Sequence, residues 1–354
     1  MKKSLFIIAA TALIISCASN DVKNDIVDEI PIGFETFSNK ALKGESALTL
    51  ESYHTTFGVW GYKTVSSTES AVMTNYKVIY NDANGSNTTY LWNYDGTNAP
   101  SGQYLKYWDK AASQYRFDAY APYSATNASI DANHVISIAS GQYAANENIQ
   151  ATLSETLNTT KFSGEGASSS TLSTDWMTAT TTRTAASNAT IATDVVSLSF
   201  SHLLTKVIVA VKTKTDFPKD INITSISLNN VMGTGSYNGT TWSTAGSTAV
   251  NVAGRTGAIS DAEKTDNANA HVFYAIECLV IPQATAAPTF SVTYTIGNDP
   301  EVFTVTAAAI TGISAFAAGS VYTITATIGP DPIHFDCTLS SDWTTGSAGS
   351  ITVD

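Results

Sequence analysis

Arginine and long hydrophobic segments are both scarce in this sequence. The three arginines are scattered over 354 residues, at Arg116, Arg183 and Arg255, and the formal net charge is −12 at pH 7. Nucleic-acid binding needs clustered Lys and Arg side chains that neutralise phosphates, so this charge argues against such a partner. After the first seventeen residues, no apolar segment approaches the roughly 20 residues of a membrane-spanning helix. The rest of the chain is therefore expected to be soluble.

Cysteine is rare as well, occurring only at Cys17, Cys278 and Cys337. An oxidising compartment would permit a disulfide between Cys278 and Cys337. Both residues lie in alternating apolar segments, where two buried free thiols fit at least equally well. The sequence leaves these two alternatives open.

Residue patterns of metal sites and of catalytic sites are missing too. The histidines show no i,i+4 pair and no cysteine at ligand spacing, so no zinc site is predicted at His54, His134, His202, His271 or His334. His202 lies in a dense apolar strand and is predicted to be a hydrogen-bonded structural histidine. No G-x-S-x-G motif or convergent catalytic set occurs. We therefore expect neither an enzyme nor a cofactor.

The first seventeen residues carry a targeting signal. Two lysines precede the mostly apolar run Leu5–Ile15, the order of a secretory signal peptide. Ile14-Ile15-Ser16 then leads directly into Cys17, which resembles the lipobox of bacterial lipoproteins. We predict a lipoprotein signal peptide over residues 1–17, lipid on Cys17 and a flexible polar leader over residues 18–29. The alternative is a plain signal peptide with an incidental cysteine.

The remaining composition favours β-structure. Only 14% of the residues are charged, while Ser, Thr, Asn, Ala and Gly are abundant. Residues 73–94 read as a hairpin, because aromatic and aliphatic residues alternate on both sides of Asn81–Ser86. Residues 104–108 and 115–122 are predicted as the next strand pair. Strand signals every ten to fifteen residues are the pattern of a β-sandwich.

A second series of strands begins near residue 195. Residues 140–194 are rich in small and polar side chains and are predicted to form long loops with one or two strands, ending at a domain boundary. One long strand is expected to run from Val195 through His202 to Val211. Further strands are expected at Ile223–Leu228, His271–Ile281, Phe290–Ile296, Val302–Val305 and Val321–Ile328. We predict an all-β chain of two tandem antiparallel domains, residues 30–192 and 193–354.

Several segments, in order, resemble the fimbrillin family of Bacteroidales bacteria, the subunits of type V pili. The resemblance covers nearly the full length, and each segment is individually loose. The segments are the lipobox at Cys17, Ile30–Phe34, Tyr107-Trp108, Tyr115–Pro122, Asp175–Ala179, Leu198–Val207, Val280–Gln283, and Tyr322–Ile324 followed by Trp343.

This resemblance implies two transthyretin-like β-sandwich domains with Greek-key connections. It also implies a structural subunit of an outer-membrane fimbria that serves adhesion. In the family, a protease removes the first strand together with the lipid, and the C-terminal segment of another subunit fills the vacated groove. The implied partners are other fimbrial subunits, the outer membrane through Cys17, and host or bacterial surface ligands.

Two sets of alternating residues match the parts of this assembly. Ile30, Ile32 and Phe34 are candidates for the removable first strand. Ile333, Phe335, Cys337 and Leu339 are candidates for a donor strand within a tail of residues 330–354. The alternative is that this second set is only the last strand of its own domain, because alternation alone does not separate the two.

The sequence departs from the family at the maturation site. The best-known pilins are cut after an arginine, whereas no arginine precedes Arg116 here. Lys40 and Lys43 are the candidate cleavage positions. Without a cut the chain would keep its lipid and resemble a fimbrial anchor or accessory protein.

A different class of function is a monomeric glycan-binding surface lipoprotein. It would use exposed aromatic rings as a stacking platform, and the candidates are Tyr90, Trp92, Tyr94, Tyr107 and Trp108. Packing of these rings in the core and in cross-strand pairs is the favoured interpretation.

Overall fold

The computed structural model describes most of the chain from residue 30 onward. The described residues are 30–38, 50, 54–83, 85, 91–142, 144–145, 175–184, 195–213, 220–259, 273–284, 288–310, 314–328, 334–340 and 349–352. Apart from one helical residue at Leu50, every regular element within these ranges is a β-strand or an isolated β-bridge, which confirms the all-β class. None of the described residues forms a hydrophobic helix of membrane-spanning length.

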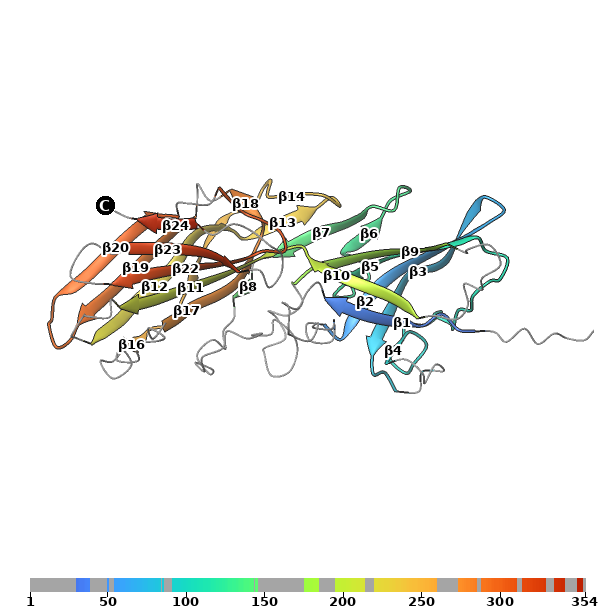
Figure 1. The fold of residues 1–354 in the computed structure, drawn as a ribbon, viewed down its shortest axis with the longest axis horizontal. Coiled ribbons are helices and arrows are strands. Elements are labelled where there is room, and N and C mark those ends of the chain that lie inside the picture. The colour runs from blue at the N-terminus through green and yellow to red at the C-terminus, as the bar shows by residue number, and fades with distance from the viewer. Residues whose placement is uncertain are drawn as a thin grey trace, which may run out of the picture.

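The strands form two groups that lie end to end along the molecule (Figure 1). The first group is a closed barrel in the order β1-β10-β9-β5-β2-β3-β4. It closes because the short strand β4 pairs with both β3 and β1. Its strands are β1 (Phe34–Ser38), β2 (Thr56–Val65), β3 (Thr68–Tyr80), β4 (Trp92–Asn93), β5 (Gln114–Ala121), β9 (Met177–Thr184) and β10 (Val196–His202).

The second group contains two larger sheets whose side chains meet in one hydrophobic cluster. The six-stranded sheet has the order β24-β23-β22-β11-β17-β8, with β8 (Ala144–Ala145), β11 (Thr205–Thr213), β17 (Phe273–Val280), β22 (Val321–Ile328), β23 (His334–Ser340) and β24 (Gly349–Thr352). The five-stranded sheet contains β12 (Ile221–Met232), β15 (Ala249–Ala253), β16 (Gly257–Ile259), β19 (Thr289–Ile296) and β20 (Val302–Ala309).

Two small sheets complete the pairing. One is two-stranded, with β18 (Gln283–Ala284) and β21 (Ala315–Phe316). The other joins residues from both halves of the chain, because β7 pairs with β13. Its strands are β6 (Ala128–Ile130), β7 (Ile136–Gln142), β13 (Thr234–Tyr237) and β14 (Trp242–Ser243). This four-stranded sheet therefore connects the two halves of the chain through the pairing of β7 with β13.

The long strand expected from Val195 to Val211 is two strands. β10 ends at His202 and pairs with β1 and β9, whereas β11 begins at Thr205 and pairs with β17 and β22. Between them, the chain bends at Leu203 and Leu204. The amide of Leu203 still donates to the carbonyl of Trp176 at 2.8 Å, in register with β9, whereas the carbonyl of Leu204 accepts from the amide of Gly319 at 2.8 Å, just before β22. The chain therefore changes sheet after His202, later than the boundary expected after residue 192. The division into two domains stays a prediction.

Two strand pairs also run parallel, β1 with β10 and β11 with β22, although an antiparallel arrangement was expected throughout. Parallel neighbours need long crossover connections, and both pairs join strands that are far apart in sequence. Residues 104–108 differ from expectation as well. They form an isolated bridge, Tyr107 with Pro31, in place of a regular strand.

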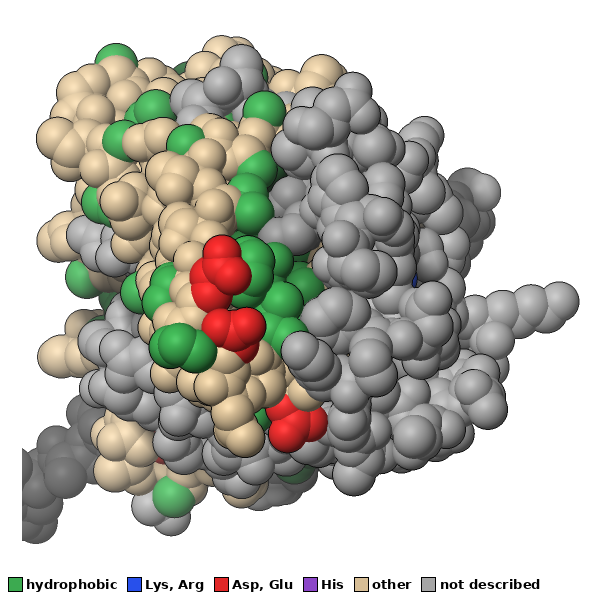
Figure 2. Space-filling view, turned by 90° about the vertical axis from the view of Figure 1, so that its left-hand side faces the viewer, with side chains coloured by type: hydrophobic (Ala, Val, Ile, Leu, Met, Phe, Trp, Pro, Cys, Tyr) green, Lys and Arg blue, Asp and Glu red, His purple; other side chains and the backbone are tan. Residues whose placement is uncertain are grey.

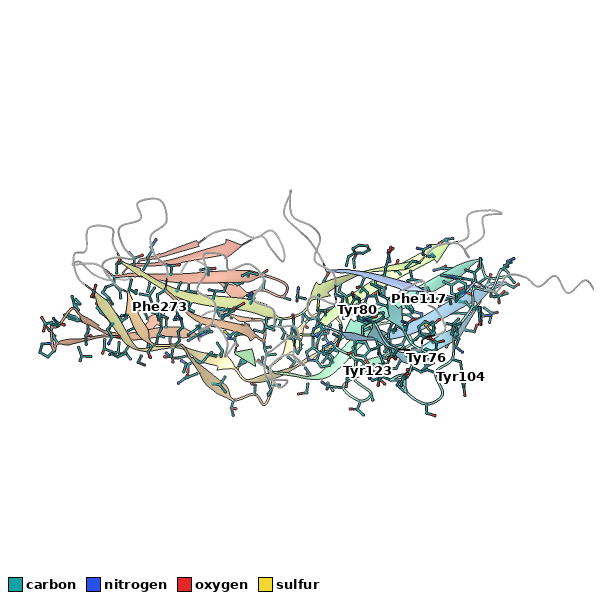
Figure 3. All side chains as sticks on the ribbon, turned by 90° about the horizontal axis from the view of Figure 1, so that it is seen from below. Tyr76, Tyr80, Tyr104, Phe117, Tyr123 and Phe273 are labelled. Atoms are coloured by element: carbon teal, nitrogen blue, oxygen red, sulfur yellow. The ribbon has the colours of Figure 1, made fainter. Side chains whose placement is uncertain are left out.

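The core of the barrel is largely aromatic. Trp92, Tyr94 and Trp108 are buried in it, which confirms the core interpretation for these three rings, whereas Tyr107 is 41% exposed. Tyr90 lies outside the described residues. Figure 3 shows Tyr76, Tyr80, Phe117 and other rings gathered in this group, while Phe273 lies in the second group.

The far end of the second group has a different surface. Figure 2 shows acidic side chains beside hydrophobic ones at this end. Asp299 and Glu301 lie in the turn between β19 and β20. The amide of Gly297, in the same turn, donates a hydrogen bond to the carbonyl of Asp220, which precedes β12. The side chains of Asp299 and Glu301 are both exposed, so the described part of this end carries negative charge at its surface.

Gly58 of β2 lies opposite Tyr120 of β5 and packs directly against its ring. A Cβ atom built there would lie 2.2 Å from the ring of Tyr120, whose hydroxyl hydrogen-bonds Asn75 and Ser124. We expect Gly58→Ala to destabilise the fold by about 1–3 kcal/mol, because the ring must leave its partners. Urea unfolding measures the change. Gly61→Ala is the control and should cost less, since the nearest atom there is 3.1 Å away on the ring of Phe117. Equal losses would contradict this account.

Candidate functional site

The candidate first strand places alternate side chains inside the barrel. Ile32, Phe34 and Thr36 are 0%, 1% and 4% exposed, whereas Glu35 between them is exposed. Ile30 is half-buried and packs against the same cluster. β1 therefore lies between β10 and β4 with these side chains inside the barrel (Figure 1). Its removal in the living cell stays a prediction.

Phe34 sits in a cage of aromatic rings. Its ring centroid lies 5.6 Å from that of Phe57, 5.7 Å from that of Phe117 and 5.9 Å from that of Tyr94, all edge to face. Such contacts contribute about 0.5–1.5 kcal/mol each beyond the burial of area. The groove is therefore built to take a phenyl ring at this position.

The backbone of β1 is paired on both sides. Five residues of β1 lie opposite Val196–Phe200 of β10, and Phe34 lies opposite Trp92 of β4. Before the strand, the amide of Ile32 donates to Lys106 O at 2.8 Å, and the amide of Trp108 donates to Ile30 O at 3.0 Å. Residues 30–38, the first described segment of the chain, thus close the barrel through backbone hydrogen bonds on both sides.

Tyr94 holds this segment from within the core. Its hydroxyl donates to the carbonyl of Ile32 at 2.8 Å, and the amide of Lys106 donates back to the hydroxyl at 3.2 Å. Burial raises the pKa of the Tyr94 hydroxyl, so the group stays protonated and remains a donor. Sequence reasoning assigned Tyr94 to the core and missed this role, because no local pattern links it to residue 32.

One polar atom on β1 is not satisfied. The hydroxyl oxygen of Thr36 is buried and has no hydrogen-bond partner among the described residues. A buried polar group left without a partner costs about 1–3 kcal/mol. β1 therefore fills the groove with one unfavourable contact at residue 36.

The C-terminal candidate strand lies in the other group. β23 pairs with β22 along its whole length and with β24 on its other side, next to the edge of the six-stranded sheet. Phe335, Cys337 and Leu339 lie opposite Ala326, Ile324 and Tyr322. This pairing corresponds to the alternative in which the strand belongs to its own sheet. The donor role stays a prediction.

Cys278 is a buried free thiol, whose pKa is raised by burial and by Glu277. β11 and β22 lie between its strand β17 and β23, which holds Cys337. Three strand spacings amount to about 14 Å, well beyond the Cα separation of a disulfide. Of the two open alternatives, the structure therefore gives the free thiol at Cys278.

A buried polar cluster lies where β10 ends. His54 Nε2 donates to the carbonyl of Asp175 at 2.7 Å, and His202 Nδ1 lies 3.0 Å from Asp175 Oδ1. This confirms His202 as a hydrogen-bonded structural histidine. Burial lowers the pKa of His54, although the nearby Asp175 carboxylate and the hydrogen bond to its backbone oppose the shift. Sequence reasoning missed this cluster because its members lie far apart in the chain.

Other expected site residues lie outside the described residues, namely Cys17, Lys40, Lys43 and Ile333. Within the described part of the chain, no group of three or more His, Cys, Asp or Glu side chains is arranged to bind a metal ion.

Comparison with known proteins now identifies the family. The model of the fimbrillin-like family matches residues 49–343. The chain belongs to the fimbrillin-like family. This membership supports the role of a fimbrial subunit, in a family of structural and adhesion proteins that associate with other fimbrial subunits at the cell surface. No curated protein matches the sequence significantly.

Solved structures that match the chain come from Bacteroides and Porphyromonas species. A putative cell adhesion protein from Bacteroides ovatus ATCC 8483 is 16% identical, with a TM-score of 0.49, and the match covers 92% of this chain and 98% of that one. One from Bacteroides uniformis ATCC 8492 is 18% identical, with a TM-score of 0.45 and coverage of 89% and 98%. The fimbrial anchor protein Mfa2 from Porphyromonas gingivalis is 11% identical, with a TM-score of 0.31 and coverage of 92% and 100%.

Replacing the unsatisfied hydroxyl of β1 should stabilise the folded chain. We expect Thr36→Val to raise the free energy of unfolding by about 1–2 kcal/mol, because valine has the same shape and needs no partner. Urea unfolding of the full chain gives the value. Thr36→Ser is the matched control and should be less stable than wild type, since it keeps the hydroxyl and loses a buried methyl group. A destabilised valine variant would disprove the assignment.

The His54 cluster should make stability depend on pH. Because the pKa of folded His54 is lowered from the usual 6.5, the unfolded chain binds more protons near that pH. The stabilisation is complete above about pH 6.5 and is lost as the pH falls from there through the lowered pKa. We expect the urea midpoint to fall between pH 7.5 and pH 5. His54→Gln keeps a donor for the Asp175 carbonyl but does not titrate, so its midpoint should fall less. An unchanged pH dependence would contradict the assignment.

Proposed function

We propose that this chain is a structural subunit of a cell-surface fimbria and assembles by strand exchange. In the precursor, β1 fills the groove between β10 and β4. A protease that cuts after Lys40 or Lys43 then removes β1 together with the lipid on Cys17. The C-terminal tail, residues 330–354, of another subunit enters the vacated groove. The polymer serves adhesion at the outer membrane.

The observation that carries this proposal is the way the barrel closes. β1 is the first described strand in the chain, it has five residues, and it lies between β10 and β4. Its loss would leave the paired edges of β10 and β4 unpaired, around a cage of aromatic rings. An open edge beside an apolar groove is the surface to which an extended segment adds.

Two domains are part of the proposal. Residues 30–192 provide most of the first and residues 193–354 most of the second, with β10 belonging to the first because it pairs with β1 and β9. The first domain then receives a strand, and the second domain supplies one. The chain acts as a structural component and carries out no catalysis.

A retained anchor or accessory subunit is the second candidate. The observation that favours it is the absence of an arginine before Arg116. A chain that is not cut at Lys40 or Lys43 would keep its lipid and stay at the outer membrane. N-terminal sequencing of protein from cells separates the two, since an anchor begins at lipidated Cys17 and a matured subunit near Ala41 or Gly44.

The glycan-binding alternative is less compatible with the barrel core. Trp92 and Trp108 are 4% and 7% exposed, so their faces are not available for stacking on a sugar. Their rings instead pack on Phe57, Tyr80, Tyr115 and Phe117.

Locking β1 in place should stop assembly. Glu35 lies opposite Ser197 in the β1–β10 register, and the serine hydroxyl donates to the Glu35 carboxylate. The double variant Glu35→Cys/Ser197→Cys should form a disulfide that keeps β1 in the barrel after proteolysis. We expect SDS-resistant ladders of surface material from the wild type, at least a tenfold loss in the double variant, and recovery with reductant.

The two single variants are the matched controls and should give ladders like the wild type. A second variant that lacks residues 330–354 should give no ladders with or without reductant. Ladders from the locked chain under oxidising conditions, or from the truncated chain, would refute strand exchange. A wild-type chain that stays monomeric would refute the fimbrial role.

A further inference from the structure

The sequence of the first strand recurs near the C-terminus. Residues 31–36 read Pro-Ile-Gly-Phe-Glu-Thr, and residues 332–337 read Pro-Ile-His-Phe-Asp-Cys. Proline, isoleucine and phenylalanine are identical at their positions, and the acidic residue is kept. Thr36 and Cys337 are both small. Only Gly33 and His334 differ strongly in size.

From this match we infer that residues 332–337 of a second copy of this chain take the place of residues 31–36, in the same direction and register. This inference rests on the proposed function and specifies which part of the tail enters the groove. Ile333, Phe335 and Cys337 then replace Ile32, Phe34 and Thr36, and the new strand runs parallel to β10, as β1 does.

The internal positions of the groove select these side chains. The cage formed by Phe57, Tyr94 and Phe117 surrounds a phenyl ring at residue 34. In this register Phe335 supplies the same ring, and Ile333 fills the place of the fully buried Ile32. The other C-terminal strand, β24, offers Ile351 but no aromatic residue. A shift by two residues would also take Phe335 out of the cage.

The shared proline also fits the backbone ladder. On either side of the Pro31–Tyr107 bridge, the carbonyl of Ile30 accepts from Trp108 and the amide of Ile32 donates to Lys106. No hydrogen bond at this bridge requires an amide at residue 31. A proline is therefore tolerated at this position, since it lacks only the amide that is not used. Pro332 meets the same condition, with the carbonyl of Asp331 and the amide of Ile333 taking over the two hydrogen bonds.

The residues that differ suggest why exchange is favourable. The Thr36 hydroxyl is buried without a partner, whereas a buried cysteine behaves as a small hydrophobic residue. The incoming strand thus removes the one unsatisfied polar atom of β1. Residue 33 is different, because Gly33 is buried on the side away from the core. The side chain of His334 would require space at this position that the buried glycine does not need.

A cross-link specific for this register tests the inference. Ser197 lies opposite Glu35 in β10, so in the fibre it should lie opposite Asp336 of the neighbouring subunit. The full-length variant Ser197→Cys/Asp336→Cys is produced on the cell surface, and its ladders are dissociated by boiling in SDS with urea without reductant. We expect covalent multimers, with the peptide pair containing residues 197 and 336 identified by mass spectrometry.

The matched control is Ser197→Cys/Thr338→Cys, which is shifted by two residues and should give at least tenfold less covalent multimer. The Ser197→Cys single variant measures any background from the native cysteines. Ladders whose dominant cross-link joins residue 197 to residue 338, or ladders without the 197–336 pair, would overturn this register and leave strand exchange intact. Absence of ladders from the wild type would overturn the proposed function as well.

The rate of ladder formation in two single variants provides a second test, which does not depend on an engineered cross-link. Thr36→Cys gives β1 the same residue as the C-terminal segment at the position of the unsatisfied hydroxyl. If Cys337 favours exchange through that position, this variant should slow ladder formation several-fold while keeping the wild-type fold. His334→Gly should accelerate it, because the bulky side chain is removed. Unchanged rates in both variants would contradict the fit argued for these two positions.

Discussion

The pairing of β1 on both of its sides is the interaction on which the first group of strands depends. Among the strands that the structure describes, only β1 connects β10 with β4. Backbone donors and acceptors buried at an unpaired edge are costly, so the barrel is complete only when an extended segment fills this place. The barrel requires a strand that carries a phenyl ring between two smaller buried side chains, and this requirement does not depend on which chain supplies the strand.

Only a few side chains contribute most of the free energy that holds this first segment in the barrel. Burying an isoleucine or phenylalanine side chain contributes about 1.5–3 kcal/mol each, and Ile32 and Phe34 are the two large residues of this segment that are almost fully buried. Tyr94 adds a hydrogen bond to the carbonyl of Ile32. A closure made of so few contacts is strong enough to hold a short strand in a folded barrel. It is also limited enough for a strand of similar sequence to compete.

Much of the architecture could be predicted from local patterns, and the failures have physical causes. β12, β19 and β22 match the expected segments because their alternation follows directly from one buried face. β17 and β20 match as well, although β17 is buried on both faces. Residues 195–211 appeared as one strand because β11 is buried on both faces, so its apolar run adjoins that of β10 without a break. The separation lies at the bend of Leu203 and Leu204, where the hydrogen-bond partner changes from Trp176 to Gly319, and no local pattern reveals this change.

In the candidate site too, some features could be predicted from the sequence and others depend on the fold. The inward alternation of Ile32 and Phe34 is visible in the sequence, but their partners are not. Phe57, Tyr94 and Phe117 come from separate segments, and only the barrel brings them around one ring. Parallel pairing with β10 was likewise hidden, because about 160 residues separate the two strands and sequence patterns carry no direction.

The positions of the two strand segments determine the kind of assembly that exchange can produce. β1 lies in the first group and β23 in the second, at different parts of an elongated molecule (Figure 1). A subunit that receives a strand in one group and supplies a strand from the other uses two different surfaces. Such heterologous contacts form open filaments unless their rotation closes a ring. Self-complementary pairing into a closed dimer would instead need both segments at one shared surface. The separation of β1 and β23 along the molecule therefore favours growth in one dimension, as a fimbria requires.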